Sequence, residues 1–173
     1  MMTGPNRQQV SENLRNYVMP HDRRISQMSG QPFGEAYFDG LLRDTGAVFD
    51  SAPPITAILA AQEMEGRGLD MLARIQRAHY VEGRRVADEQ VLQTLAVELG
   101  LDAARFGAAY AGLVGTPTTE HIAQSRKLLS RVGGQGFPTF VLERQDGFQI
   151  LDLGGYLGDV AGWRAELVRQ TQA

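Results

Sequence analysis

Near the end of the chain, residues 136–142 have the sequence Gly136-Phe137-Pro138-Thr139-Phe140-Val141-Leu142, which is the most informative segment about the fold. Aromatic and β-branched residues dominate it, so it predicts a β-strand over 137–142. A second apolar run, 148–153, follows the turn residues Gln145-Asp146-Gly147, and the two runs predict an antiparallel hairpin. Because the first strand is apolar on both faces, it suits the interior of a sheet larger than two strands can form.

The residues that follow the hairpin predict a glycine-rich turn and then a last helix over 159–170. Val160, Trp163 and Leu167 have the spacing of an inward face, and Trp163 is expected to hold this helix to the hairpin. A phosphate loop is one interpretation of the segment 154–158, since helix N-termini bind anions. Its spacing is not that of a dinucleotide-binding motif, so a tight strand-to-helix turn is the preferred interpretation.

Upstream of the hairpin the sequence pattern is helical. A first helix is predicted over 6–29, with Asn6 as its N-cap and a break or kink at Pro20. Residues 31–50 mix glycine and proline with aromatic residues, which favours short helical turns. Five more helices are predicted, over 51–65, over 69–82, from Asp88 to Gly100, from Asp102 through Tyr110, and from Thr116 to Val132. The chain therefore divides into a helical segment, 1–132, and a strand-strand-helix segment, 133–173.

Composition excludes several classes of function. The chain has 173 residues, is 43% hydrophobic and carries a net charge of -3, which predicts a soluble globular protein without a basic surface for nucleic acid. No stretch approaches the roughly 20 consecutive apolar residues of a membrane span. Cysteine is absent, so the chain has no thiol nucleophile and no thiolate zinc site. His21, His79 and His121 lie far apart, and we expect no metal, no cofactor and no catalytic residue.

A family resemblance rests on the run Gly136-Phe137-Pro138-Thr139-Phe140-Val141, which resembles the cis-proline segment of DsbA-family thioredoxin folds. The segments 51–54 and 76–102 resemble the helical insertion of its FrnE-like branch, and the similarity extends over 34–167. It implies an α/β, thioredoxin-like fold of the DsbA type with a large α-helical insertion, mostly helical and with a C-terminal β-hairpin.

The same resemblance bears on the start of the chain. In that family a strand, a helix headed by Cys-x-x-Cys and a second strand precede the insertion, so the N-terminal part of the thioredoxin domain is expected to be missing. Met1 would then lie where the second strand has just ended. A late start codon, a trimmed chain and a shortened protein are the alternatives.

The resemblance also implies a substrate-binding site at Gly136, Phe137 and Pro138. A cis Pro138 would direct the N–H and C=O of Phe137 toward an extended peptide. About 5 to 6% of X-Pro bonds are cis, and the residues alone favour a trans proline at an edge strand.

Three functions follow. The first is a DsbA-family thiol-disulfide oxidoreductase or isomerase by resemblance, redox-inactive alone because the chain has no catalytic cysteines. The second is a non-catalytic module that binds a peptide or partner, with a homodimer covering an exposed strand edge. The third is a relative of the glutathione-dependent isomerases of small molecules. Expected partners are a peptide or protein thiol, with no nucleic acid and no membrane, and the FrnE-like resemblance implies a cytoplasmic location.

Overall fold

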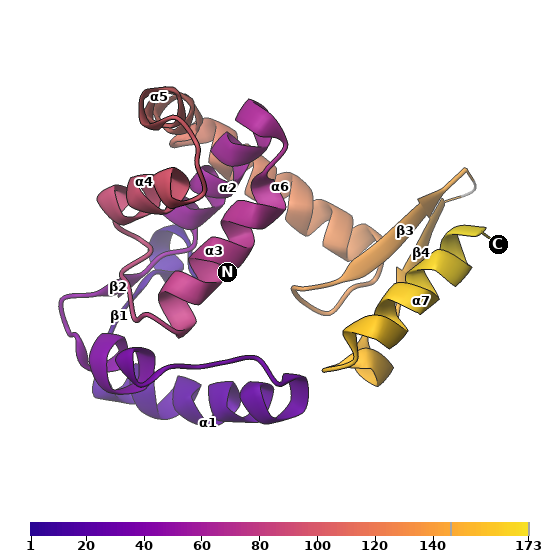
Figure 1. Ribbon diagram of the computed structural model, residues 1–173, viewed down its shortest axis with the longest axis horizontal. Coiled ribbons are helices and arrows are strands. Elements are labelled where there is room, and N and C mark those ends of the chain that lie inside the picture. The colour runs from indigo at the N-terminus through magenta and orange to yellow at the C-terminus, as the bar shows by residue number, and fades with distance from the viewer. Residues whose placement is uncertain (146, 173) are drawn as a thin grey trace. The chain divides into compact units, whose positions relative to one another are not determined.

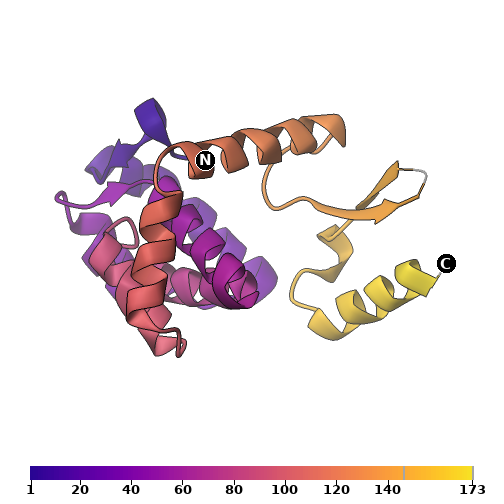
Figure 2. The same cartoon turned by 90° about the horizontal axis from the view of Figure 1, so that it is seen from above.

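The computed structural model describes residues 1–145 and 147–172, which form two compact units. The helical unit consists of residues 1–23 and 32–120, and the hairpin unit consists of residues 24–31 and 121–172. Figures 1 and 2 show the elements of each unit.

The first part of the chain differs from its prediction. A 3-10 turn, Gly4–Asn6, and a short strand, β1 (Gln8–Gln9), precede helix α1 (Glu12–Ser29). The expected N-cap, Asn6, is wrong, because the hydroxyl of Ser11 accepts the N–H of Leu14 at 3.2 Å. Residues 8 and 9 pair instead with β2 (Val48–Phe49), an antiparallel strand distant in the sequence.

Pro20 lies inside α1 and does not end it. Its missing N–H leaves the carbonyl of Asn16 without a helical donor. Both residues are exposed, so water can satisfy that carbonyl. Between α1 and β2, the expected short turns are confirmed as η2 (Ala36–Gly40) and η3 (Leu41–Arg43).

The next five helices lie close to their predicted positions. They are α2 (Ala52–Glu65), α3 (Gly68–Tyr80), α4 (Glu89–Glu98), α5 (Ala103–Leu113) and α6 (Thr116–Arg131). The carboxylate of Asp102 caps α5 by accepting the N–H of Arg105 at 2.8 Å. Asp88 stands at the N-cap of α4, but its side chain accepts no capping hydrogen bond.

The main core of the helical unit lies where α2 packs against α3, α4 and α5. The fully buried apolar residues that helix α2 contributes there are alanines, Ala57, Ala60 and Ala61, while Ile58 and Met64 are partly buried against the same core. The larger side chains come from its neighbours: Met71, Ile75, Leu92, Leu95, Phe106 and Tyr110. Small residues on one helix allow large residues on the others to fill the space between them.

The hairpin unit contains the predicted pair of strands. Strands β3 (Phe140–Arg144) and β4 (Gly147–Leu151) are antiparallel, with Phe140 opposite Leu151 and Arg144 opposite Gly147. The first strand begins three residues later than predicted. Asp146 of the predicted turn lies outside the described residues. Among the described strands, β3 pairs only with β4.

The last helix, α7 (Val160–Gln172), lies along the hairpin, and the short turn η4 (Gly154–Tyr156) precedes it. The indole of Trp163 packs edge-on against Phe140, with ring centroids 5.5 Å apart, which confirms its expected contact with the hairpin. Leu167 is half-buried, but Val160 is 78% exposed, so its predicted inward position is wrong. Val160 is the first residue of α7, where the carboxylate of Asp159 caps the helix through the N–H of Gly162.

Candidate functional site

The end of α6 determines where the loop 133–139 begins. Gly133 has φ +72°, a left-handed conformation that ends helices and that glycine adopts without a steric penalty. The N–H of Gly133 bonds the carbonyl of Ser130 at 3.1 Å, and the N–H of Gly134 bonds that of Leu129 at 2.9 Å. These bonds end the last turn of α6 and fix the position of the backbone at which the loop begins.

Gly134 lies under the loop in close contact with its neighbours. A β-carbon at this position would collide with the Cδ1 atom of Leu129 and would lie 3.0 Å from the Oγ1 atom of Thr139. A larger residue at this position would therefore displace the end of the Leu129 side chain and crowd Thr139.

The three residues expected to bind substrate lie together at the surface. Gly136, Phe137 and Pro138 are all exposed, and Phe137 is 52% exposed. The Phe137-Pro138 peptide bond is cis, as the resemblance implied. The N–H and C=O of Phe137 make no hydrogen bond to another described residue. A backbone donor and acceptor at one exposed residue can pair with the backbone of an extended peptide.

Aromatic and aliphatic side chains continue from this loop over the hairpin unit. Phe140 is 40% exposed and contacts Trp163, which also packs against Tyr156 at 5.5 Å between ring centroids. Ile150, which pairs with Val141, is 48% exposed on the other face of the hairpin. The loop therefore lies beside apolar surface that a ligand side chain could contact.

His79 does not belong to this site. It lies in the helical unit among the rings of Tyr37, Phe49 and Tyr80, with centroid distances of 5.2, 5.0 and 4.7 Å. Burial lowers its pKa to about 4 and outweighs the backbone hydrogen bond near Arg84, which acts in the opposite direction. Its Nδ1 atom is buried and has no partner among the described residues. His79 is therefore a neutral side chain packed among aromatic rings.

A polar pair that the sequence did not predict lies next to this histidine. The hydroxyl of Tyr37 donates to the carboxylate of Asp22 at 2.7 Å. Burial raises the pKa of Asp22, and burial together with this hydrogen bond raises the pKa of Tyr37. The sequence held one signal for the pair, an acidic residue near the apolar side of the predicted first helix.

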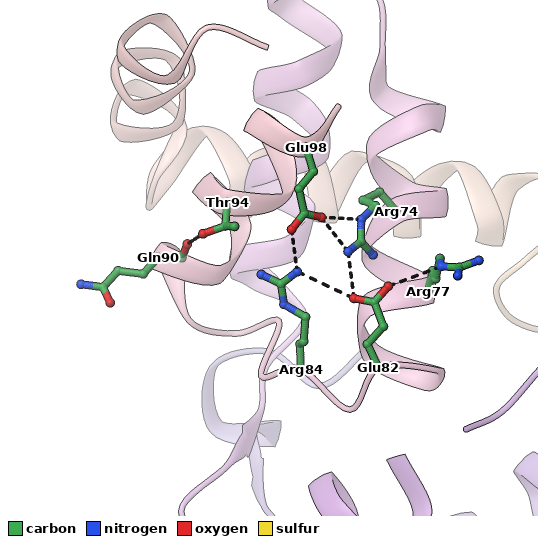
Figure 3. Close-up of polar contacts among 7 residues, drawn as sticks. All are labelled: Arg74, Arg77, Glu82, Arg84, Gln90, Thr94 and Glu98. Atoms are coloured by element: carbon green, nitrogen blue, oxygen red, sulfur yellow. Dashed lines mark hydrogen bonds and ion pairs between the residues drawn. The ribbon is translucent and has the colours of Figure 1, made fainter. Parts of the chain in front are cut away.

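A network of charged residues joins α3 to α4, as Figure 3 shows. Arg74 bonds Glu82 at 2.8 Å and Glu98 at 2.6 Å, and Arg84 bonds Glu98 at 3.0 Å. The hydrogen bond from Arg74 is the main cause that lowers the pKa of Glu82. Carboxylates paired in this way stay ionised and are poor candidates for acid-base catalysis, so the network is structural.

Neither a metal site nor a membrane span is found in the described part of the chain. Within residues 1–145 and 147–172, no three histidine, aspartate or glutamate side chains cluster as metal ligands. None of the described helices combines the length and the hydropathy needed to cross a bilayer.

Known proteins resemble this chain over most of its length. Residues 40–154 match the family described as the DSBA-like thioredoxin domain. The cytosolic disulfide reductase DsbM from Pseudomonas aeruginosa is 57% identical, with a TM-score of 0.91, and the match covers 95% of this chain and 79% of DsbM. A second DsbM structure, with glutathione, is 56% identical, with a TM-score of 0.90 and coverage of 96% and 80%.

A more distant structure shares the fold alone. It is the structure of a candidate protein disulfide isomerase from Nitrosomonas europaea, and it is 22% identical to this chain with a TM-score of 0.76. That match covers 96% of this chain and 78% of the other. No curated protein matches the chain.

Proposed function

Because the chain belongs to the DSBA-like thioredoxin family, we propose that its loop 136–138 binds the backbone of a peptide that carries a thiol or a disulfide. This membership confirms the resemblance drawn from the proline segment, and with it the thioredoxin-like fold that is mostly helical and ends in a β-hairpin. The three site residues, Gly136, Phe137 and Pro138, are part of the proposal.

One observation carries the proposal: Phe137 is an exposed residue, and its backbone has a donor and an acceptor that no described residue uses. An extended peptide can satisfy both groups at once, as in the addition of a strand to a sheet. The half-exposed ring of Phe137 and the neighbouring Phe140 add apolar contact beside these polar groups. Backbone pairing selects an extended peptide without selecting its sequence.

Glutathione is the peptide we propose as the first ligand to test. One of the DsbM structures is a structure with glutathione, and this chain is 56% identical to that protein. By the same similarity to a cytosolic reductase, we propose a cytoplasmic location.

We propose that these 173 residues bind the peptide but do not catalyse thiol-disulfide exchange. Thiol-disulfide exchange begins when a thiolate attacks a disulfide sulfur, and the chain has no cysteine to supply that thiolate. We therefore expect no turnover in an insulin-reduction assay. A rate above the reagent blank in a cysteine-free preparation would refute this part of the proposal.

Titration with reduced glutathione, followed by ¹H–¹⁵N NMR, tests the binding. We expect shifts for the amides of Gly136, Phe137 and Phe140. Phe137→Ala should weaken binding about fivefold, because it removes apolar contact worth roughly 1 kcal/mol. Val160→Ala is the matched control, since Val160 is more exposed and lies outside the loop. The absence of any shift at millimolar glutathione would contradict the proposal.

A further inference from the structure

We propose that Thr139 is a positioning residue for the ligand-binding loop. Its hydroxyl donates to the carbonyl of Gly136 at 2.5 Å, and this bond fixes the direction in which the N–H of Phe137 points. The inference rests on the proposed function of the loop, and it adds a residue that the predicted site did not contain.

The planarity of the peptide bond connects the two groups. The carbonyl of Gly136 and the N–H of Phe137 belong to one peptide unit, which is planar and, outside the Phe137-Pro138 bond, trans. In a trans unit the C=O and the N–H point in opposite directions. When the hydroxyl of Thr139 holds the carbonyl, the N–H of Phe137 must point away from Thr139, and it stays available to a ligand.

Pro138 cannot replace the hydrogen bond that Thr139 donates. Pro138 has no backbone N–H, so it cannot donate to the carbonyl of Gly136. At 2.5 Å the bond from Thr139 is at the short end of the range for O–H···O bonds, and among the described residues no other donor reaches that carbonyl. The orientation of the peptide unit therefore depends on one side chain.

Thr139 is itself held in place by the end of α6. It is half-buried, and a β-carbon on Gly134 would lie 3.0 Å from its Oγ1 atom and 3.1 Å from its Cγ2 atom. Gly134 in turn bonds the carbonyl of Leu129 in the last turn of the helix. Threonine also has few χ1 rotamers. The end of α6 therefore restricts the position of the Thr139 hydroxyl, and the hydroxyl restricts the carbonyl of Gly136.

A simpler role for Thr139 is that of a β-branched residue that favours the adjoining strand. Two substitutions separate the roles. Thr139→Val keeps the shape and the β-branch but removes the hydroxyl, whereas Thr139→Ser keeps the hydroxyl and removes the branch. If Thr139 positions the loop, Thr139→Val should lose the order of the Phe137 amide and the affinity for the ligand, whereas Thr139→Ser should keep both. If Thr139 acts only through packing, Thr139→Val should keep both and Thr139→Ser should lose them.

The first experiment needs no ligand. ¹⁵N relaxation should give the Phe137 amide an order parameter of about 0.85 in the wild type and in Thr139→Ser, and a value below about 0.6 in Thr139→Val. Thr171→Val is the matched control, because Thr171 also donates its hydroxyl to backbone carbonyls, of Leu167 and Val168, but in α7. An unchanged order parameter in Thr139→Val would overturn the inference. Thr139→Ala replaces the valine variant if that variant does not fold.

The second experiment measures the affinity for reduced glutathione. Thr139→Val should bind about tenfold more weakly, the upper range for one hydrogen bond, and Thr139→Ser should return to within about twofold of the wild type. Equal binding by wild type and Thr139→Val would overturn the positioning role and leave the proposed function standing. If the wild type itself does not bind, the proposed function fails, and the relaxation experiment alone decides the role of Thr139.

Discussion

The helical unit and the hairpin unit differ in where their apolar side chains lie. In the helical unit, Met71, Leu92 and Phe106 are fully buried against neighbouring helices. In the hairpin unit, Phe137, Ile150 and Val160 are each about half exposed or more, and none of the described residues of α7 is buried. The first unit is thus stabilised by its own core, whereas the second presents apolar surface to which a ligand or another polypeptide can bind.

The largest expected effect comes from removing one aromatic ring in each unit. Phe106→Ala should lower the free energy of unfolding by about 3 to 5 kcal/mol, because it opens a cavity among fully buried residues. Phe140→Ala, at a ring that is 40% exposed, should cost about 1 kcal/mol. Urea denaturation measures both. Equal losses would show that the two units are packed alike.

A close contact between backbones inside the helical unit provides the second test. Gly83 has φ +65°, and a β-carbon there would collide with the carbonyl of Ala36, so Gly83→Ala should destabilise by about 2 to 3 kcal/mol. Gly107→Ala is the control in α5, where no atom lies within contact distance of an added β-carbon. It should stabilise slightly, by about 0.5 to 1 kcal/mol. If both variants lose stability to the same extent, strain at Gly83 is not the cause.

His79, a largely enclosed histidine with a buried Nδ1 atom, makes the stability of the helical unit depend on pH. The pKa of His79 falls from 6.5 to about 4 on folding, so between these values the unfolded chain binds a proton that the folded chain does not. The free energy of unfolding should therefore decrease as the pH falls from 7 to 4, by about 2 to 3 kcal/mol from this group. Asp22, with a raised pKa, contributes in the opposite direction at the acid end.

Comparison with a variant isolates the contribution of His79. His79→Phe should show a smaller loss of stability than the wild type between pH 7 and pH 4, measured by urea denaturation at each pH. His121→Gln is the control at an exposed histidine in α6. Parallel pH profiles for wild type and His79→Phe would mean that this side chain does not cause the acid sensitivity.

The smallest effect is expected from the network in Figure 3. Arg74→Met removes one of the two arginines that pair with both Glu82 and Glu98, the other being Arg84, and should cost about 1 to 2 kcal/mol. Arg43→Met removes the exposed ion pair with Asp39 and should cost less than about 0.5 kcal/mol. Because salt screens both pairs, the difference should shrink in 1 M NaCl, and denaturation at two salt concentrations measures it.

The sequence predicted the regular part of the fold well. Local signals determined these elements: the two prolines that start α2, the Asp102 cap of α5, and the apolar runs of β3 and β4 on either side of a turn. The pairing of β1 with β2 was missed, because Gln8 and Gln9 have no strand pattern and their partners lie about 40 residues away. Such a pairing depends on tertiary packing, which local propensity does not contain.

Some residues of the proposed site were likewise predicted from the sequence, and others were not. The motif around Pro138 identified Gly136, Phe137 and Pro138, and the structure places them together at the surface. The contribution of Thr139 could not be predicted, because it depends on a hydroxyl rotamer and on the contact with Gly134. The pair formed by Asp22 and Tyr37 was missed for a related reason, since it joins two elements whose relative positions the sequence did not determine.

The methyl groups of Ala57, Ala60 and Ala61 have a consequence for how this protein can vary. Each is fully buried in a core that is otherwise filled by larger side chains from adjacent helices, so a large side chain at any of the three would overpack the core. In a library that samples every amino acid at every position, these three sites should tolerate glycine or serine at most. They would then appear among the most restricted positions of the chain, although alanine is the smallest side chain in the core.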